Sequence, residues 1–327
     1  MGSPESSCVL SWTTLLIGIA LLGASVVQAL TPFLWAPKNN TGSSNWSTNS
    51  NWSGSAVPTN DGTAIIQIAS TTSKTAPVVD VAWAINALQF KTTNTAHTLS
   101  GQLLTIGAGG ISQTTTKVQT VANAITLAAN QTWSGTAGGL TLTGSTNLAG
   151  YTLNTVTSGT GVMTLGAFTG AGTLQVASGT TVTLGKSVTD SSLNLTLSGG
   201  TLKLNNLTQT FGNLNVTANS VIDFGTGGSV LSLTGITIAS GVVLTVKNWA
   251  DMADYFYSSG WTGATPDVSG VAPMNQVVFT GWNASATKWQ GGDNQVTPTP
   301  ESSTYGLGLM ACLTLGVGLA RRWRGSQ

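Results

Sequence analysis

The chain has 327 residues, but Asp, Glu, Lys and Arg make up only 6% of them, and its net charge is +1. A soluble domain carries about 25% charged residues and a nucleic-acid-binding domain an excess of basic ones, so the composition excludes a basic nucleic-acid groove. Hydrophobic residues contribute 41% and glycine contributes 41 residues, which together exclude charge-driven disorder and an ordinary amphipathic helical domain.

Arginine and cysteine are confined to the ends of the chain. The arginines are Arg321, Arg322 and Arg324, and the cysteines are Cys8 and Cys312. The body of the chain therefore has no cysteine with which to form a disulfide framework. A neutral, secreted β protein rich in Thr, Gly and Asn fits this composition.

The N-terminus has the features of a secretory signal peptide. Residues 12–27 form an apolar run, and the small residues Val27 and Ala29 fit cleavage by signal peptidase after Ala29. The segment before the run carries no Lys or Arg, which departs from the usual pattern and leaves a buried or anchoring helix as the alternative. We expect residues 1–29 to be a signal peptide with a helical apolar core.

Residues 30–68 are expected to form an N-terminal cap on a stack of strands. The unit Asn-Trp-Ser occurs twice, at Asn45 and Asn51. Flat Trp rings are well suited to cover the open strand edges at the end of such a stack. The paired Trp units resemble the start of autotransporter-like repeat proteins. A sugar-stacking platform made by Trp46 and Trp52 is the alternative.

Residues 69–247 are predicted to be the body of an all-β solenoid. Short segments alternate Thr or Asn with Leu, Val or Ile and are separated by Gly, Ser or Asn, as in 181–184 and 193–197. Alternation with period two puts the apolar side chains on one face of a strand and the polar ones on the other. Self-similar segments recur at spacings near multiples of roughly 20 residues, the length of one β-helix coil.

We therefore predict a right-handed parallel β-helix with inward-facing Leu, Val and Ile. The alternative all-β architecture is a sandwich, which favours Asn-Gly or Asp-Gly hairpin turns between longer strands. Asp61-Gly62 is the one such turn, and it lies before the repetitive segment. Each coil of a solenoid buries its apolar residues on its neighbours and needs few charged residues, which agrees with the composition.

Residues 248–289 break the repetitive pattern and are expected to form a C-terminal cap. We predict a short helix from Asn248 to Tyr257, with Asn248 as its N-cap. The aromatic anchors of this cap would be Trp261, Trp282 and Trp289. The arrangement resembles the C-terminal cap of the same repeat families, through Asn248-Trp249 and Trp289-Gln290-Gly291. Residues 290–299 are expected to be a flexible linker.

A polar motif, an apolar segment and a basic end follow one another in residues 300–327. The motif is Pro300-Glu301-Ser302, the apolar segment runs from 307 to 320, and the basic end consists of Arg321, Arg322 and Arg324. Basic residues remain on the cytoplasmic side of a membrane, so the arginines would stop the apolar helix there. The segment is shorter than the ~20 residues of a permanent span, which suits a transient anchor.

This tail resembles the PEP-CTERM sorting domain, which exosortases read in many Gram-negative bacteria. The family motif is Pro-Glu-Pro followed by small residues, and here Ser302 stands in place of the second proline. The resemblance implies export, transient anchoring in the inner membrane, and delivery to the cell surface, the outer membrane or an extracellular exopolysaccharide matrix. It also implies an exosortase-like processing enzyme as a partner. A simple C-terminal membrane anchor is the alternative.

The residue types needed for catalysis or metal binding are sparse in the body of the chain. Glycoside hydrolysis uses two carboxylates about 5–10 Å apart, and no acidic pair falls on a predicted strand. Asp251 and Asp254 are three residues apart, and we interpret them as part of a helix N-terminal turn, with catalysis or Ca²⁺ binding as the alternative. His97 is the single histidine and is expected in a solvated loop. We assign no catalytic, cofactor-binding or metal-binding residue.

Composition, repeats and tail together predict an exported structural or adhesive protein of the cell surface or exopolysaccharide matrix. Its partners would be signal peptidase, the exosortase-like enzyme and exopolysaccharide or other surface proteins, with no nucleic acid among them. The alternative is a secreted carbohydrate-active β-helix enzyme, either a polysaccharide hydrolase or a lyase. Two or three Asp side chains gathered in one groove would favour the enzyme, and Asp side chains scattered over the corners would favour the scaffold.

Overall fold

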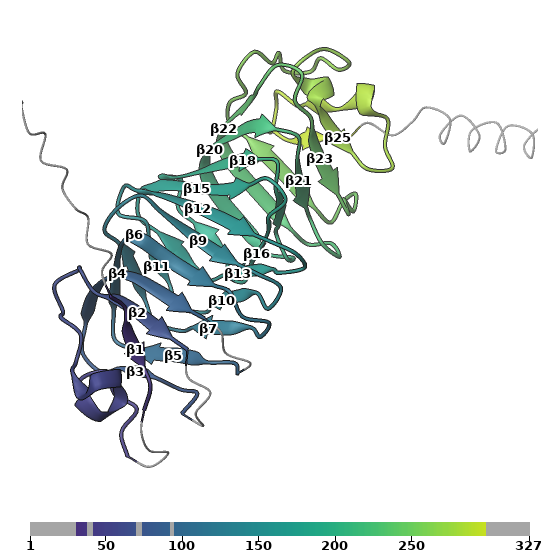
Figure 1. Ribbon diagram of the computed structural model, residues 1–327. Coiled ribbons are helices and arrows are strands. Elements are labelled where there is room, and N and C mark those ends of the chain that lie inside the picture. The colour runs from purple at the N-terminus through teal and green to yellow at the C-terminus, as the bar shows by residue number, and fades with distance from the viewer. Residues whose placement is uncertain (1–30, 38–41, 70–73, 92–94, 299–327) are drawn as a thin grey trace, which may run out of the picture. The chain divides into compact units, whose positions relative to one another are not determined.

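The computed structural model describes residues 31–37, 42–69, 74–91 and 95–298, and these form an all-β, right-handed parallel β-solenoid (Figure 1). The predicted parallel β-solenoid is confirmed, and the sandwich alternative is wrong because successive coils pair in parallel. The helices among the described residues are all short 3₁₀ helices: η1 (Asn49–Asn51), η2 (Ser53–Ser55), η3 (Met274–Gln276) and η4 (Ala284–Ala286). The predicted signal helix and sorting helix lie outside the described residues.

Each coil contributes to three faces, which we number in the order in which the chain visits them. Face 1 is formed by β1 (Phe33–Trp35), β2 (Ile65–Ile68), β9 (Gln131–Gly135), β12 (Thr152–Thr157), β15 (Gly172–Ala177) and β18 (Leu193–Ser198). Four long strands add their C-terminal halves to face 1: β4 (Trp83–Phe90), β6 (Leu104–Gln113), β20 (Thr208–Ala218) and β22 (Val230–Ile238).

Face 2 is a separate sheet of ten strands. Its members are β3 (Val78–Val79), β5 (Thr98–Gly101), β7 (Gln119–Val121), β10 (Leu140–Leu142), β13 (Met163–Leu165), β16 (Thr181–Leu184), β19 (Thr201–Lys203), β21 (Ser220–Asp223), β23 (Leu244–Lys247) and β25 (Val277–Phe279). Face 3 consists of the N-terminal halves of β4, β6, β20 and β22 together with β8 (Ile125–Leu127), β11 (Thr146–Asn147), β14 (Phe168–Thr169), β17 (Val188–Thr189) and β24 (Tyr255–Ser258). Because the long strands bend across the corner between them, faces 3 and 1 belong to one hydrogen-bonded sheet.

The register between coils confirms the sequence repeat. On face 1, Ile66 pairs with Leu88, Leu88 with Ile111, and Ile111 with Trp133, so these coils are 22 or 23 residues long. The shortest step on this face, from Leu197 to Val216, is 19 residues. The differences in length fall at the corners and at two register shifts, between Ile85 and Ala87 of β4 and between Leu197 and Ser198 of β18.

Alternation within each strand builds the core, and β18 is typical. Leu193, Leu195 and Leu197 are fully buried, whereas Asn194 and Thr196 face outward. Burying one Leu side chain contributes about 1.5–3 kcal/mol, and the same gain recurs in every coil. The result is one continuous apolar core that runs through the described coils.

Asparagine side chains join neighbouring coils at the corners. Asn130 Oδ1 accepts a hydrogen bond from the Thr152 backbone N–H in the next coil at 2.8 Å, and Asn219 Oδ1 accepts one from the Val243 N–H at 2.8 Å. These bonds satisfy backbone groups where the strand ladder is interrupted. The high Asn content of the sequence therefore has a structural role at the corners.

The parallel stack extends beyond the body predicted from the sequence, and the predicted helix from Asn248 to Tyr257 is wrong. Asn248 has φ +57 and caps no helix, and the chain continues through a turn into β24. The physical reason is that this segment completes another coil: Phe256 pairs with Leu231 of β22 and is fully buried. Trp249 packs on the core edge-on to Phe224, with ring centroids 5.1 Å apart.

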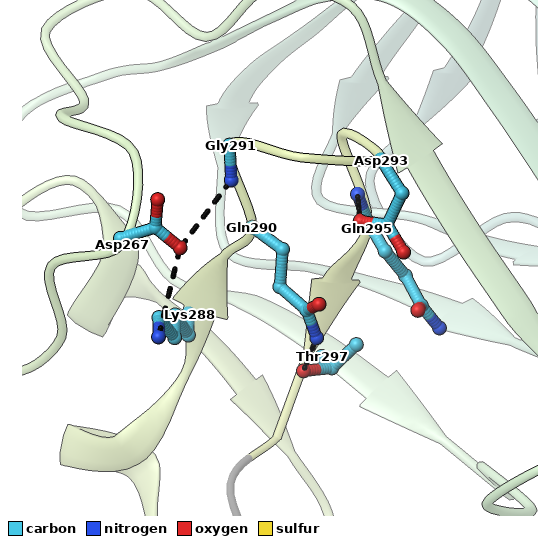
Figure 2. A network of polar contacts seen from close by, with 7 residues as sticks. All are labelled: Asp267, Lys288, Gln290, Gly291, Asp293, Gln295 and Thr297. Atoms are coloured by element: carbon cyan, nitrogen blue, oxygen red, sulfur yellow. Dashed lines mark hydrogen bonds and ion pairs between the residues drawn. The ribbon is translucent and has the colours of Figure 1, made fainter.

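Residues 290–298, expected to belong to a flexible linker, instead form part of a hairpin. β26 (Lys288–Trp289) and β27 (Val296–Thr297) pair antiparallel, and Val296 is fully buried. Figure 2 shows the polar contacts around the hairpin: Lys288 and Asp267 form an ion pair at 3.6 Å, and Gln290 Nε2 donates to Thr297 Oγ1 at 3.3 Å. Pairing with β26 and burial of the Val296 side chain explain why residues 290–298, which are mostly polar, belong to the fold.

Glycine at position 144 is required by the close approach of two coils. A Cβ atom at Gly144, on the corner between β10 and β11, would overlap the backbone carbonyl oxygen of Asn123 in the preceding coil. We expect Gly144→Ala to destabilise the protein by about 1–3 kcal/mol, the usual cost of forcing extra atoms into a packed site. A lower midpoint of thermal unfolding, followed by circular dichroism, would show it.

Gly292→Ala is the matched control, because nothing lies within 4 Å of the corresponding Cβ position at Gly292. Equal midpoints for the two variants would contradict the proposed steric role of Gly144.

Candidate functional site

The outward residues of face 2 form a ladder of threonines. One residue from each of five successive strands lies in the same column, in register with its neighbours. The column consists of Thr98, Thr120, Thr141, Thr164 and Thr183. Neighbouring strands lie about 4.8 Å apart, so the hydroxyl groups repeat at that spacing. The sequence alternation predicted outward threonines, but the column itself emerges only from the register.

Face 1 carries a second ladder, which is uncharged and richer in amides. Its column consists of Thr132, Asn154, Gln175, Thr196, Asn215 and Thr237. Side chains in and beside the column bond to one another between coils, as Thr217 Oγ1 does to Ser198 Oγ at 3.0 Å. A shallow hollow of about 270 Å³ lies at the edge of this face, lined by Asn130, Thr152 and Asn154 among others. Face 1 thus offers hydroxyl and amide groups in a regular array.

The column of face 2 changes from threonine to charged residues in the later coils. Lys203 follows Thr183 in register, Asp223 follows Lys203, and Lys247 follows Asp223. A hollow of about 330 Å³ lies here, lined by Lys203, Asn205, Asp223, Gly225, Thr226 and Asn248. Asp223 Oδ1 accepts hydrogen bonds from Asn248 Nδ2 at 2.6 Å and from the Gly225 N–H at 3.0 Å.

The eight aspartates of the described residues are Asp61, Asp80, Asp190, Asp223, Asp251, Asp254, Asp267 and Asp293. Among the described residues, no group of three or more His, Cys, Asp or Glu side chains comes together. Asp251 and Asp254 do not share a helix face: Asp251 is exposed, whereas Asp254 is fully buried and accepts hydrogen bonds from the Ser229 and Ala250 N–H groups. Their interpretation as part of a helical turn is wrong, because the chain makes a corner of the solenoid there. Asp254 holds that corner in place.

Hydrogen bonds from nearby hydroxyls lower the pKa of several other aspartates. The Ser192 hydroxyl and backbone N–H hold the pKa of Asp190 below 3.8, and Thr63 does the same for Asp61. Burial raises the pKa of Asp80, but hydrogen bonds from the hydroxyl and N–H of Ser47 outweigh it and leave that pKa below 3.8. The Asp80 contact joins the N-terminal segment to the turn after β3.

His97 is buried, with only 1% of its surface exposed, so the prediction of a solvated loop histidine is wrong. The chain enters β5 at this position, and the His97 backbone N–H donates to Gln119 Oε1 at 2.9 Å. Gln119 belongs to the next coil and is itself fully buried. His97 therefore lies inside the solenoid, next to the following coil.

Trp46 and Trp52 are fully buried, so the sugar-stacking alternative is wrong for both rings. Trp52 Nε1 donates to the Trp46 carbonyl oxygen at 2.6 Å, and the two rings meet edge to face at 5.6 Å. Trp46 also meets Trp83 of β4 edge to face, with ring centroids 5.8 Å apart. The rings therefore pack on the first coils instead of facing a ligand.

Two tyrosines that the sequence analysis did not single out lie on face 3. Tyr255 and Tyr257 of β24 have parallel rings 5.9 Å apart, and Tyr255 is 36% exposed. Burial, together with the nearby Tyr255 and Asp293, raises the pKa of Tyr257 above 10.0. The period-two spacing of Tyr255 and Tyr257 was the signal that would have placed both rings on the same side of a strand.

The residues predicted to direct sorting lie outside the described part of the chain. They are Ala29, Pro300, Glu301, Ser302, Arg321, Arg322 and Arg324. Within the described ranges, no helix combines the length and the apolar character needed to cross a membrane. No protein-family model matches the sequence, and no curated protein or solved structure is significantly similar to it.

The Asp80 contact leads to a prediction about acid stability. A carboxyl whose pKa is lowered on folding stabilises the protein above its ordinary pKa of 3.8, and this stabilisation is lost as the pH falls through the lower, folded value. We expect Asp80→Asn to lower the thermal midpoint near neutral pH and to reduce the loss of stability below pH 3.8. Tryptophan fluorescence, sensitive to the nearby Trp46, would follow the transition.

The control is Asp251→Asn, which removes an exposed carboxylate without touching the Ser47 contact. The prediction fails if Asp80→Asn loses as much stability as the unmodified protein over the same acid range.

Proposed function

We propose that this chain is an exported structural or adhesive protein of the cell surface or exopolysaccharide matrix, sorted through a PEP-CTERM-like tail. The observation that carries the proposal is the pair of polar columns, the hydroxyl and amide residues of face 1 and the five threonines of face 2, which present uncharged polar groups in successive coils. A surface of this kind suits a partner that is itself a repeating, hydroxyl-rich polymer.

Many weak contacts would supply the adhesion. A single hydrogen bond contributes about 0.5–1.5 kcal/mol net, so no one threonine or asparagine binds tightly alone. Contacts repeated along one polymer act as linked binding events, and their combined affinity far exceeds that of each. The backbone ladder also holds the strands in place before binding, which lowers the entropy cost of association.

The order of segments along the chain supports export and sorting. An apolar N-terminal run with a cleavage site after Ala29 would direct secretion, and the tail beginning at Pro300 would hold the protein in the inner membrane until an exosortase-like enzyme acts. The described body lies between these two segments. In this proposal the body reaches the outer membrane, the cell surface or the extracellular matrix after cleavage.

A binding role is better supported than hydrolysis or lyase activity. The usual hydrolytic mechanism requires two carboxyl groups that flank the scissile bond. In the hollow on face 2, the described residues supply one carboxylate, Asp223, beside the ammonium group of Lys203. A single carboxylate and an ammonium group suit recognition of a saccharide.

The intact mass and location of the protein in its native host test the proposal. We expect a species that begins at Leu30, ends near Pro300 and is found outside the cell; mass beyond the polypeptide would show glycosylation. Ser302→Pro restores the Pro-Glu-Pro motif and should increase the cleaved fraction, whereas Glu301→Ala should decrease it. Immunoblots of membrane and extracellular fractions would measure both.

Asp293→Ala, an exposed substitution upstream of the motif, is the control and should leave processing unchanged. A membrane-bound species that retains Arg321–Arg324 in all variants would favour a simple anchor and would remove the support for a matrix role.

A further inference from the structure

We propose that the hollow on face 2 beside Lys203, Asp223 and Lys247 binds an acidic saccharide unit of a polysaccharide. The inference deepens the proposed surface role and rests on it, because it specifies the chemistry of the polymer bound. We call the hollow and the three charged residues the charged subsite. The hollow is lined by the ends of β19 and β21, at Lys203 and Asp223, and by residues that follow β19, β21 and β23, and Lys247 stands next to Asp223 in the column beside it.

The position of the charges within the ladder is the first observation. Five coils in succession place threonine in the central column of face 2, and the next three place Lys203, Asp223 and Lys247 there. Charged residues are only 6% of the chain, so three in adjacent positions concentrate charge at this one place. The column carries one net positive charge, which favours an anionic ligand.

The second observation is that both ammonium groups are available to a ligand. Within the part of the chain that the structure describes, the only ion pair joins Lys288 to Asp267, and neither Lys203 nor Lys247 takes part in one. Both side chains are exposed. Strands on one face lie about 4.8 Å apart, so two lysines two strands apart can approach one carboxylate from both sides.

The Asp223 carboxylate is oriented before any ligand arrives. Its Oδ1 atom accepts from Asn248 Nδ2 at 2.6 Å and from the Gly225 N–H at 3.0 Å. Its Oδ2 atom takes no hydrogen bond from the described residues and can accept from sugar hydroxyl groups. A carboxylate is an acceptor only, and a sugar ring presents several donors to it.

The corner beside the subsite is held in an uncommon backbone conformation. Asn205, Gly225 and Asn248 have φ values of +59, +91 and +57, in the left-handed region that residues other than glycine rarely adopt. A side-chain pair between coils supports it: the Thr226 N–H donates to Asn206 Oδ1 at 2.9 Å, and Asn206 Nδ2 donates to Thr226 Oγ1 at 2.6 Å. A wall that is already ordered loses little entropy on binding.

Size and charge together point to a uronic acid type of unit. The hollow of about 330 Å³ is at the small end of ligand sites, which suits one or two sugar rings of a longer chain that continues over the polar faces. A uronate carries one carboxylate for the lysines and hydroxyl groups for Asp223. A phosphate would bring a second negative charge next to Asp223 and offers few donors to it, so it fits less well.

Isothermal titration calorimetry on the full chain tests the inference. The probe is a galacturonic acid oligomer, compared with a neutral galactose oligomer of equal length. We expect the acidic oligomer to bind more tightly, with an affinity that falls as salt is raised, because exposed charges are screened. Lys203→Thr combined with Lys247→Thr continues the threonine ladder, and it should weaken binding of the acidic oligomer at least tenfold.

The matched control is Lys91→Thr combined with Lys117→Thr, which removes the same charge from residues that lie outside the column of Lys203, Asp223 and Lys247. Asp223→Asn should weaken both oligomers, whereas the lysine pair should affect only the acidic one. The inference is overturned if the acidic oligomer does not bind, or if both double variants bind it alike. Thermal unfolding of each variant separates lost binding from lost folding.

The result of the calorimetry is independent of the result of the localisation experiment. A protein that is processed and found outside the cell but ignores the acidic oligomer would overturn the charged subsite and leave the proposed function standing. A protein that is never exported would overturn the proposed function whatever the calorimetry shows.

Discussion

Parallel pairing between coils is the constraint on which the rest of the structure depends. A single coil has no partner for its strand edges and no place to bury its apolar side chains, and stacking meets both needs at once. Leu174, Leu195 and Leu214 show the result, since they pair in register and are all fully buried. A one-residue slip would turn these side chains outward, so insertions and deletions must be absorbed at the corners.

The same constraint exposes unpaired edges at both ends of the stack, and the atypical segments cover them. At the start, the Trp46 N–H donates to the Val78 carbonyl oxygen, so the segment before η1 covers the edge of β3. At the far end, the Ser258 N–H donates to the Asn294 carbonyl oxygen, and the hairpin β26–β27 lies against β24. The need to cover these edges explains why many of the tryptophans lie near the two ends of the stack, because one large ring covers more exposed edge than a branched aliphatic side chain.

Alternation and Gly-punctuated repeats were sufficient to predict the solenoid, because period-two burial is a local property of each strand. What failed depends on contacts between coils. His97 is buried and its backbone N–H bonds to Gln119 of the next coil, and Val296 is buried in a hairpin where it pairs with Trp289. Neither contact can be read from the local sequence. The polar columns escaped prediction for the same reason: coil length varies by several residues, so neighbours across coils cannot be read from spacing alone.

In the proposed function, the outer surface would combine two kinds of recognition that follow from the same architecture. Columns of threonine and amide side chains would give many equivalent contacts to a polymer but would discriminate poorly between sugars. The charged residues Lys203, Asp223 and Lys247, which follow the threonines in the column, would add a contact that depends on the charge of the polymer. Because the backbone register places these residues next to the threonine ladder, a chain lying along face 2 would meet both. Selectivity would then depend on three side chains, and affinity on the length of the ladder.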